Sequence, residues 1–243
     1  MNRKIKIGCL LLAVFMLSGC VSDRALEGKK EAEQVKKLVE DNNKQLEKKM
    51  ENILYEEQTT NTPPTEVEIK DYNEKYNTAI IKTSLGDITI KFSNADTPKT
   101  VANFMKLADA GFYDGVKFHR VIKGFMIQTG DPLSKDDSQK NAWGTGGPGY
   151  VMPAEIKLEN KKGTIATARL GDQMNPKKDS SGSQFFINTV DNAFLNGGYT
   201  VFGEVTSGME TALKIENVKT TAPGQLDRPV EDVTIKNIEL LKK

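Results

Sequence analysis

Cysteine, histidine and tryptophan are scarce in this chain, which has two cysteines, one histidine and one tryptophan among 243 residues. Two cysteines allow at most one internal disulfide, and a single histidine cannot build the nitrogen or sulfur ligand cluster that zinc and similar metals need. A calcium site made of carboxylates alone stays open, although the acidic stretch SKDDSQ at 134–139 lacks the ligand spacing of an EF-hand loop. We therefore expect no metal at the functional site.

A surplus of charge of either sign is also absent. The 34 Lys and Arg residues nearly balance the 33 Asp and Glu residues, which leaves a formal net charge of +1. Domains that bind DNA or RNA usually carry a strong basic excess or a basic patch. The balance argues against a nucleic-acid partner.

Two familiar catalytic or cofactor patterns do not fit the sequence. A Ser-His-Asp triad would have to use His119, the single histidine, yet no G-x-S-x-G elbow is present. The segment GTGGPG at 144–149 matches G-x-G-x-x-G, but it is followed by Pro153 and by no helical period. A pyrophosphate-binding turn leads from a strand into a helix, so we interpret these glycines as a loop close to a bound peptide.

The first twenty residues have the pattern of a signal peptide. Three basic residues among the first six precede an apolar run at 7–17, which is too short to span a membrane. The run ends in LSGC at 17–20, which resembles the lipobox of bacterial lipoproteins. We expect a signal peptide at 1–19 and acyl chains such as palmitate on Cys20, which would anchor the protein to the outer face of the cytoplasmic membrane. A secretory signal with a chance cysteine is the alternative.

Residues 20–77 have the composition of a spacer. Residues 27–58 are rich in good helix formers, but their apolar stripe is interrupted at 40–45 and supports no long heptad run. A solvated helical spacer or a weak coiled coil is expected there. The segment TTNTPPTEVE at 59–68 has the Thr and Pro content of an extended linker. We place the start of the functional domain at residue 78.

From residue 78 to 243 the sequence reads as many short strands separated by glycines, which favours a barrel or a sandwich. The clearest helix signal lies at 96–113, where Asp96 or Thr97 can cap and Pro98 suits the first turn. A shorter helix is expected at 207–215. Because strands and helices do not alternate regularly, the predicted fold is antiparallel β with two helices.

Five motifs follow one another in this domain: TPKTVANFMKLADAGFYDG at 97–115, FHRVIKGFMIQTGD at 118–131, GTGGPGY at 144–150, SGSQFFI at 181–187 and FLNGGYTVFGEV at 194–205. Together they resemble one family, the cyclophilin-type peptidyl-prolyl cis-trans isomerases, and the resemblance covers about residues 79 to 240. It implies a mainly β fold, a closed eight-stranded antiparallel barrel capped by two α-helices. It also implies isomerase (rotamase) activity on proline-containing polypeptides in protein folding, without a cofactor.

The resemblance also assigns site residues. It makes Arg120 and Gln128 catalytic and gives substrate binding to Phe125, Met126, Ala168, Arg169, Phe186, Phe194, Leu195 and Tyr199. Three of these depart from the best-known eukaryotic pattern, because Arg169 replaces an asparagine, Phe194 a tryptophan and Tyr199 a histidine. The loss of the indole N–H at Phe194 puts tight cyclosporin binding in doubt.

These residue types suit the reaction. Rotation about an X-Pro bond breaks no covalent bond, so a catalyst has only to bind the twisted amide better than either planar isomer. Arg120 can donate to the prolyl nitrogen as twisting releases its lone pair, and Gln128 can hold a substrate carbonyl. His119 lies one residue before Arg120, so strand alternation places its ring on the other side, and we expect a hydrogen-bonded structural imidazole.

The leading interpretation is a membrane-tethered isomerase with a monomeric catalytic domain that helps exported proteins fold. A non-enzymatic chaperone or holdase that binds proline-containing peptides is the main alternative. A third interpretation gives the main role to the N-terminal helix, as an oligomerising or envelope-spacing element.

Overall fold

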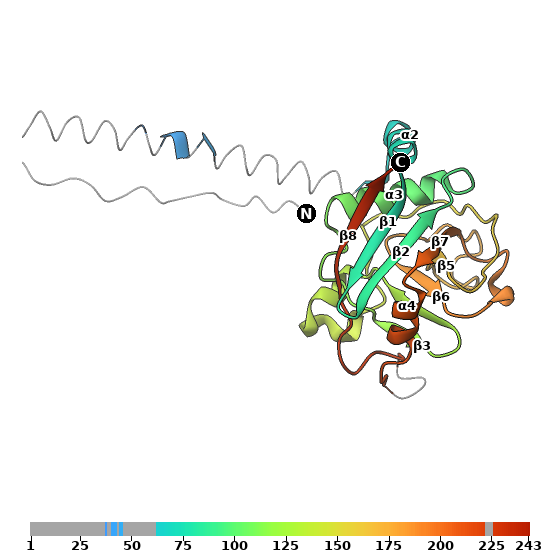
Figure 1. Ribbon diagram of the computed structural model, residues 1–243. Helices are drawn as coiled ribbons and strands as arrows, with labels where there is room; N and C mark the ends of the chain where they lie inside the picture. Colours follow the sequence, from blue (N-terminus) through green and yellow to red (C-terminus); the bar gives the residue numbers. More distant parts are fainter. Residues whose placement is uncertain (1–36, 38–39, 43, 46–61, 222–225) are drawn as a thin grey trace, which may run out of the picture. The chain divides into compact units, whose positions relative to one another are not determined.

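The computed structural model (Figure 1) describes residues 37, 40–42, 44–45, 62–221 and 226–243. The predicted signal peptide, Cys20 and most of the predicted spacer lie outside these residues. The chain divides into two units, Met1–Ile53 and Leu54–Lys243. In the first unit the described residues are helical and exposed. Within the described residues, no helix is both long enough and apolar enough to cross a membrane.

The second unit is built on one eight-stranded antiparallel sheet with the order β3-β4-β6-β5-β7-β2-β1-β8. The strands are β1 (Tyr76–Thr83), β2 (Gly86–Phe92), β3 (Arg120–Ile122), β4 (Met126–Thr129), β5 (Thr164–Thr167), β6 (Phe185–Asn188), β7 (Val201–Ser207) and β8 (Ile235–Lys242). The predicted antiparallel β class is confirmed. The hydrogen-bonded ladder has two ends, β3 and β8, and does not show the closed barrel. An isolated bridge, Lys117 to Thr234, and neighbouring backbone hydrogen bonds join the segments near the starts of these two strands.

The middle strands bury both of their faces. Alternate residues enter the main hydrophobic core, and we call this side the core face; it includes Ile127, Ile165, Phe185, Ile187 and Phe202. The residues between them form a second, smaller cluster on the side that we call the cup face, with Met126, Ala166, Phe186 and Val201. Because side chains alternate along a strand, a buried run such as FFIN in β6 supplies both clusters at once.

Two predicted helices are confirmed, as α3 (Pro98–Asp109) and α4 (Met209–Glu216). Pro98 occupies the first turn of α3 as expected, but Thr97 makes no capping bond, and its hydroxyl donates to the Ser93 carbonyl. The carboxylate of Glu155, from a distant loop, accepts from the backbone N–H groups of Lys99 and Thr100 instead. Three short 3-10 helices, η1 (Pro132–Lys135), η2 (Asp137–Ala142) and η3 (Ala193–Leu195), shape the remaining loops.

A further helix, α2 (Glu66–Lys75), lies in the stretch that the sequence assigned to the spacer and linker. It contacts α3 through Glu68, whose carboxylate is 3.2 Å from the Lys106 ammonium, and through Tyr72, whose hydroxyl donates to Asp109 at 3.1 Å. Figure 1 shows α2 beside α3. The pKa of Glu68 lies below its usual value. Burial acts to raise this pKa, but the hydrogen bonds from Thr65 and Lys106 together outweigh burial. The folded unit therefore includes α2, and the predicted start at residue 78 falls within it, after β1 has begun.

Candidate functional site

A cavity of about 370 Å³ opens on the cup face. It lies where β3, β4 and β6 meet the loops after η2, β5 and η3 and the segment that precedes β8. Nine of the ten predicted site residues line it: Arg120, Phe125, Met126, Gln128, Ala168, Arg169, Phe186, Leu195 and Tyr199. Residues far apart in the sequence are thus brought together by the sheet.

Phe194 is the predicted residue that does not line the cavity. Its side chain is 74% exposed and stacks on Phe125, with the two ring centroids 5.5 Å apart. Phe194 therefore supports the wall from outside. The departure from tryptophan at this position leaves the apolar rim in place.

Arg120 and Gln128 are directly paired across β3 and β4, so their side chains leave the sheet on the same side. Gln128 donates to the Gln184 side-chain carbonyl at 3.0 Å, and Gln184 donates in turn to the carbonyls of Gly144 and Gly146 at 3.0 and 2.8 Å. The guanidinium of Arg120 has no hydrogen bond or ion pair with any described residue. Its donors are therefore free for a ligand.

Gln184 was missed as a positioning residue, although it stands inside the motif SGSQFFI. It fixes the side-chain amide of Gln128 and joins it to the loop that begins at Gly144. Sequence alone gave Gln184 no role because its partners lie 38 to 56 residues away along the chain.

The floor of the cavity is apolar. Met126, Phe186 and Leu195 are 2, 4 and 8% exposed, and Phe125 and Tyr199 are partly buried against them. The rings of Phe186 and Tyr199 meet edge to face at 5.7 Å. An apolar cup of this size next to a free guanidinium can hold a small ring and leave one polar group within reach of Arg120.

Arg169 is bound tightly to its surroundings. Its Nε donates to the Gly198 carbonyl at 2.5 Å, and its guanidinium is 2.6 Å from the Asp172 carboxylate. The same group lies 4.7 Å from the Tyr199 ring centroid. The arginine that replaces asparagine in this chain therefore braces the Tyr199 wall and keeps its charge compensated.

His119 also lines the cavity, and the prediction that its imidazole is hydrogen-bonded and faces away is wrong. The ring is 4% exposed, and neither nitrogen has a hydrogen-bond partner among the described residues. Strand alternation did not apply because β3 begins at Arg120. Burial lowers the pKa of His119 to about 4 against the opposing charge of Asp131, so the ring is neutral at pH 7.

The glycine-rich loop is shaped by a buried carboxylate. Asp131 accepts from the backbone N–H groups of Leu133 at 2.8 Å, of Gly146 at 3.2 Å and of Gly144. A side chain at Gly146 would overlap Asp131, which explains why a glycine is needed there. The loop is followed by no helix, so no dinucleotide turn is formed. In the described part of the chain, no three metal-ligating side chains come together.

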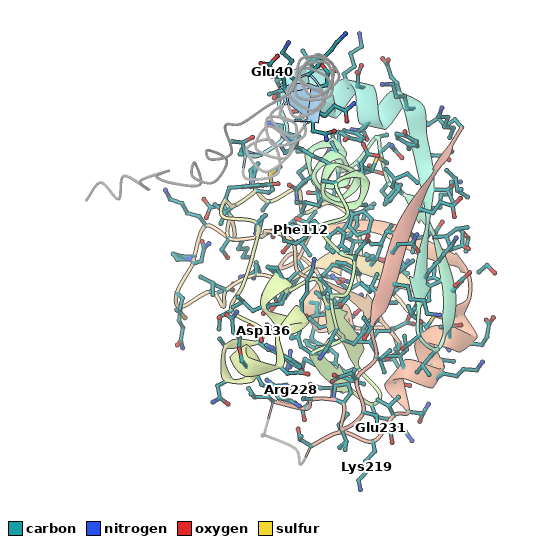
Figure 2. All side chains as sticks on the ribbon, turned by 90° about the vertical axis from the view of Figure 1, so that its left-hand side faces the viewer. Glu40, Phe112, Asp136, Lys219, Arg228 and Glu231 are labelled. Atoms are coloured by element: carbon teal, nitrogen blue, oxygen red, sulfur yellow. The ribbon has the colours of Figure 1, made fainter. Side chains whose placement is uncertain are left out.

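The wall beyond Arg120 was not predicted. It consists of Trp143, Leu226 and Arg228, with the Arg228 guanidinium carbon 4.6 Å from the centroid of the Trp143 ring. The indole N–H of Trp143 donates to the Asp136 carbonyl at 3.1 Å, and Figure 2 shows Asp136 and Arg228 on the same side of the molecule. No motif marks these residues, because tertiary packing alone brings them beside Arg120.

Comparison with known proteins places this site in a family. The model of the family "Cyclophilin type peptidyl-prolyl cis-trans isomerase/CLD" matches residues 78–240. The chain belongs to the cyclophilin-type peptidyl-prolyl cis-trans isomerases. It carries the domain of an enzyme family, and the cavity described above lies in this cyclophilin domain beside the free guanidinium of Arg120.

Curated relatives agree with this assignment. The cyclophilin domain is 40% identical to peptidyl-prolyl cis-trans isomerase A of Dickeya dadantii, over 68% of this chain and 84% of that protein. It is 42% identical to peptidylprolyl isomerase domain and WD repeat-containing protein 1 of Mus musculus, over 66% of this chain but only 23% of that protein. The chain thus spans less than a quarter of the length of this larger relative.

Solved structures show the same fold. A cyclophilin-type peptidyl-prolyl cis-trans isomerase of Cryptosporidium parvum is 31% identical, with a TM-score of 0.60 over 69% of this chain and 99% of that chain. A second structure of that protein, determined in the presence of the dipeptide Ala-Pro, has a TM-score of 0.59 at 31% identity, over 68% of this chain and 99% of that chain.

Proposed function

We propose that this protein accelerates cis-trans isomerisation of X-Pro bonds in polypeptides. The observation that carries the proposal is the free guanidinium of Arg120 at the edge of an apolar cup. The cup is apolar, as the pyrrolidine ring of proline is, and the cavity of about 370 Å³ is large enough to admit that ring. The binding of proline-containing peptides is supported by the relative that was crystallised in the presence of Ala-Pro.

The chemistry follows from the amide bond. Resonance imposes a barrier of about 18–20 kcal/mol on rotation about the C–N bond. At the twisted transition state the prolyl nitrogen regains its lone pair and becomes a hydrogen-bond acceptor. A donor from Arg120 stabilises that state more than either planar isomer, which is the condition for acceleration.

The remaining residues hold the substrate. Phe125, Met126, Phe186 and Leu195 surround the ring, and Gln128 is oriented by Gln184 so that its amide can bind a substrate carbonyl. No side chain has to accept a proton, so the neutral, low-pKa imidazole of His119 takes no part in proton transfer. The cup is complete within one chain, which supports a monomeric catalytic domain.

The proposed cellular setting is the outer face of the cytoplasmic membrane, where the enzyme would act on exported proteins. The signal-like segment at 1–19 and the LSGC sequence that ends at Cys20 support this proposal. Incorporation of labelled palmitate into the wild type, and its loss in Cys20→Ala with release of the protein from the membrane fraction, is the expected result. Equal labelling of the two proteins would contradict lipidation at Cys20.

The catalytic proposal is tested with residues 21–243 and a peptide that contains one X-Pro bond. We expect exchange between the cis and trans resonances, followed by NMR, to become faster in proportion to the amount of protein added. Binding of the peptide without faster exchange would instead favour the holdase.

A further inference from the structure

The charge of the cavity wall is one-sided. Three arginines line the cavity, at positions 120, 169 and 228, and no Asp or Glu is among the lining residues. Arg169 has its own carboxylate partner, Asp172, at 2.6 Å. Within the described residues, Arg120 and Arg228 form no ion pair. The transition-state role proposed above accounts for the free guanidinium of Arg120 but not for that of Arg228.

Arg228 is a buried cation. The residue is 8% exposed, and its Nε has no hydrogen-bond partner in the described part of the chain. Lys117, which packs against the same tryptophan ring, lies 2.6 Å from Asp137 and 2.6 Å from Asp232. Lys117 therefore has two carboxylate partners, whereas Arg228, which packs on the same ring, has none among the described residues. A buried charge without a partner is costly, which points to a ligand that supplies one.

The position of the Arg228 guanidinium is fixed before any ligand arrives. It lies over Trp143, which is 5% exposed and held by its bond to the Asp136 carbonyl. The backbone of Arg228 is tied to Thr221 by two bonds, N–H to hydroxyl at 3.0 Å and carbonyl to N–H at 2.8 Å. A guanidinium held in this way loses little side-chain entropy on binding an anion, and its planar donors match a carboxylate.

We propose that Arg228, on its Trp143 platform, forms a subsite for an aspartate or glutamate side chain close to the isomerising proline. The inference rests on the proposed function, because the ligand is a residue of the same polypeptide whose proline occupies the cup. An acidic side chain is the anion that an ordinary polypeptide carries within one or two residues of proline. The subsite thus makes the enzyme selective for acidic segments around X-Pro bonds.

The experiment compares peptides that differ by one residue. Glutamate and glutamine are placed in turn at each position from two before to two after the proline, and kcat/KM for exchange is measured by NMR with residues 21–243. We expect glutamate to be preferred over glutamine by roughly tenfold at one of these positions, as for a desolvated hydrogen bond between charged groups. In Arg228→Gln, the ratio of kcat/KM for the glutamate peptide to kcat/KM for the glutamine peptide should fall to about one.

Lys236→Gln is the matched control, because Lys236 is exposed on β8 and lies outside the cavity, yet its loss changes the net charge by the same amount. Lys236→Gln should keep the roughly tenfold preference for the glutamate peptide over the glutamine peptide. Arg228→Glu adds a second readout that misfolding cannot imitate, since the preference should then shift to a lysine peptide at the same position.

The outcomes separate the two proposals. Acceleration of the neutral peptides with no preference for glutamate at any position would overturn the subsite and leave the isomerase intact. A preference that persists in Arg228→Gln would overturn it as well. Failure to accelerate any of the peptides, neutral or acidic, would instead remove the proposed function on which the subsite depends.

Discussion

Phe185 and Phe186 are adjacent on β6 and almost equally buried, at 1 and 4% exposed, yet they belong to different parts of the molecule. Phe185, on the core face, meets Phe104 at 5.3 Å and Tyr113 at 5.6 Å between ring centroids. Phe186, on the cup face, meets Tyr199 and lines the cavity. One residue type at one degree of burial therefore serves the interior in one case and the binding site in the other.

The difference lies in the neighbours of the two rings. On the core face Phe185 belongs to a large cluster of buried hydrophobic residues that includes Phe104, Tyr113 and Phe202. On the cup face the apolar cluster is smaller and stands beside Arg120, Gln128 and Arg228. Burial alone does not mark a functional residue. A better mark of a functional site is an apolar cluster that is open to solvent and bordered by hydrogen-bond donors without partners.

Truncating each ring in turn tests most directly whether Phe185 and Phe186 have different roles. Phe185→Ala should lower the free energy of unfolding by about 4 kcal/mol, because it leaves a closed cavity in the core. Phe186→Ala should lower it by about half as much, since water can enter the open cup, but it should raise KM for an X-Pro peptide. Urea denaturation and NMR exchange measure the two effects. Equal losses of stability would contradict the distinction between the faces.

His119 makes the stability of the protein depend on pH, because its titratable imidazole is buried at the cup. Its pKa is about 4 in the folded protein and about 6.5 in an unfolded chain. Between these values the unfolded state takes up a proton that the folded state does not. The imidazole therefore costs no stability above pH 6.5, and the cost grows to about 3 kcal/mol as the pH falls to 4.

His119→Gln removes this contribution. The stability of the variant should thus fall less steeply than that of the wild type between pH 6.5 and 4, as measured by urea denaturation at a series of pH values. Carboxylates titrate in both proteins, so the difference between the two curves isolates His119. Parallel curves would show that the ring is not buried in the neutral form.

The smallest expected effect concerns α2, which packs on the helical layer that covers the core face. Glu68→Gln removes the partner of Lys106, whose side chain is 7% exposed, and should cost about 1 kcal/mol. Glu74→Gln is the control, because its pair with Lys70 is exposed on both sides and contributes no more than about 0.5 kcal/mol. Hydrogen exchange of the α2 amides reports both. Similar exchange in the two variants would mean that α2 is not held by Glu68.

Strand alternation, turn residues and helix signals in the sequence were enough to predict the antiparallel class and the helices α3 and α4. The motifs placed nine of the ten expected residues around one cavity. The helix α2 was missed, although Thr65 and Glu68 form a capping box, because the two prolines before it indicated a linker. The local signal for α2 was present, but its docking on α3 depends on Lys106 and Asp109, far along the chain.

The missed part of the site has a different cause. Trp143 and Arg228 are 85 positions apart in the sequence and stand in no recognisable spacing. His119 was misplaced because alternation was extended one residue beyond the start of β3. Periodicity describes the residues within one element, whereas these three side chains are brought to the cavity wall by loops whose course depends on tertiary contacts.

Substitution of Arg120 tests the central claim most directly. The proposed mechanism needs the guanidinium donor of Arg120 at the twisted amide, whereas the fold does not depend on this side chain. With residues 21–243 and an X-Pro peptide, Arg120→Ala should reduce kcat/KM for isomerisation by about 10²–10³-fold, measured as NMR exchange. Because Arg120 makes no hydrogen bond or ion pair with the described residues, the free energy of unfolding should change by less than about 1 kcal/mol. An unchanged exchange rate in a folded Arg120→Ala variant would contradict the account.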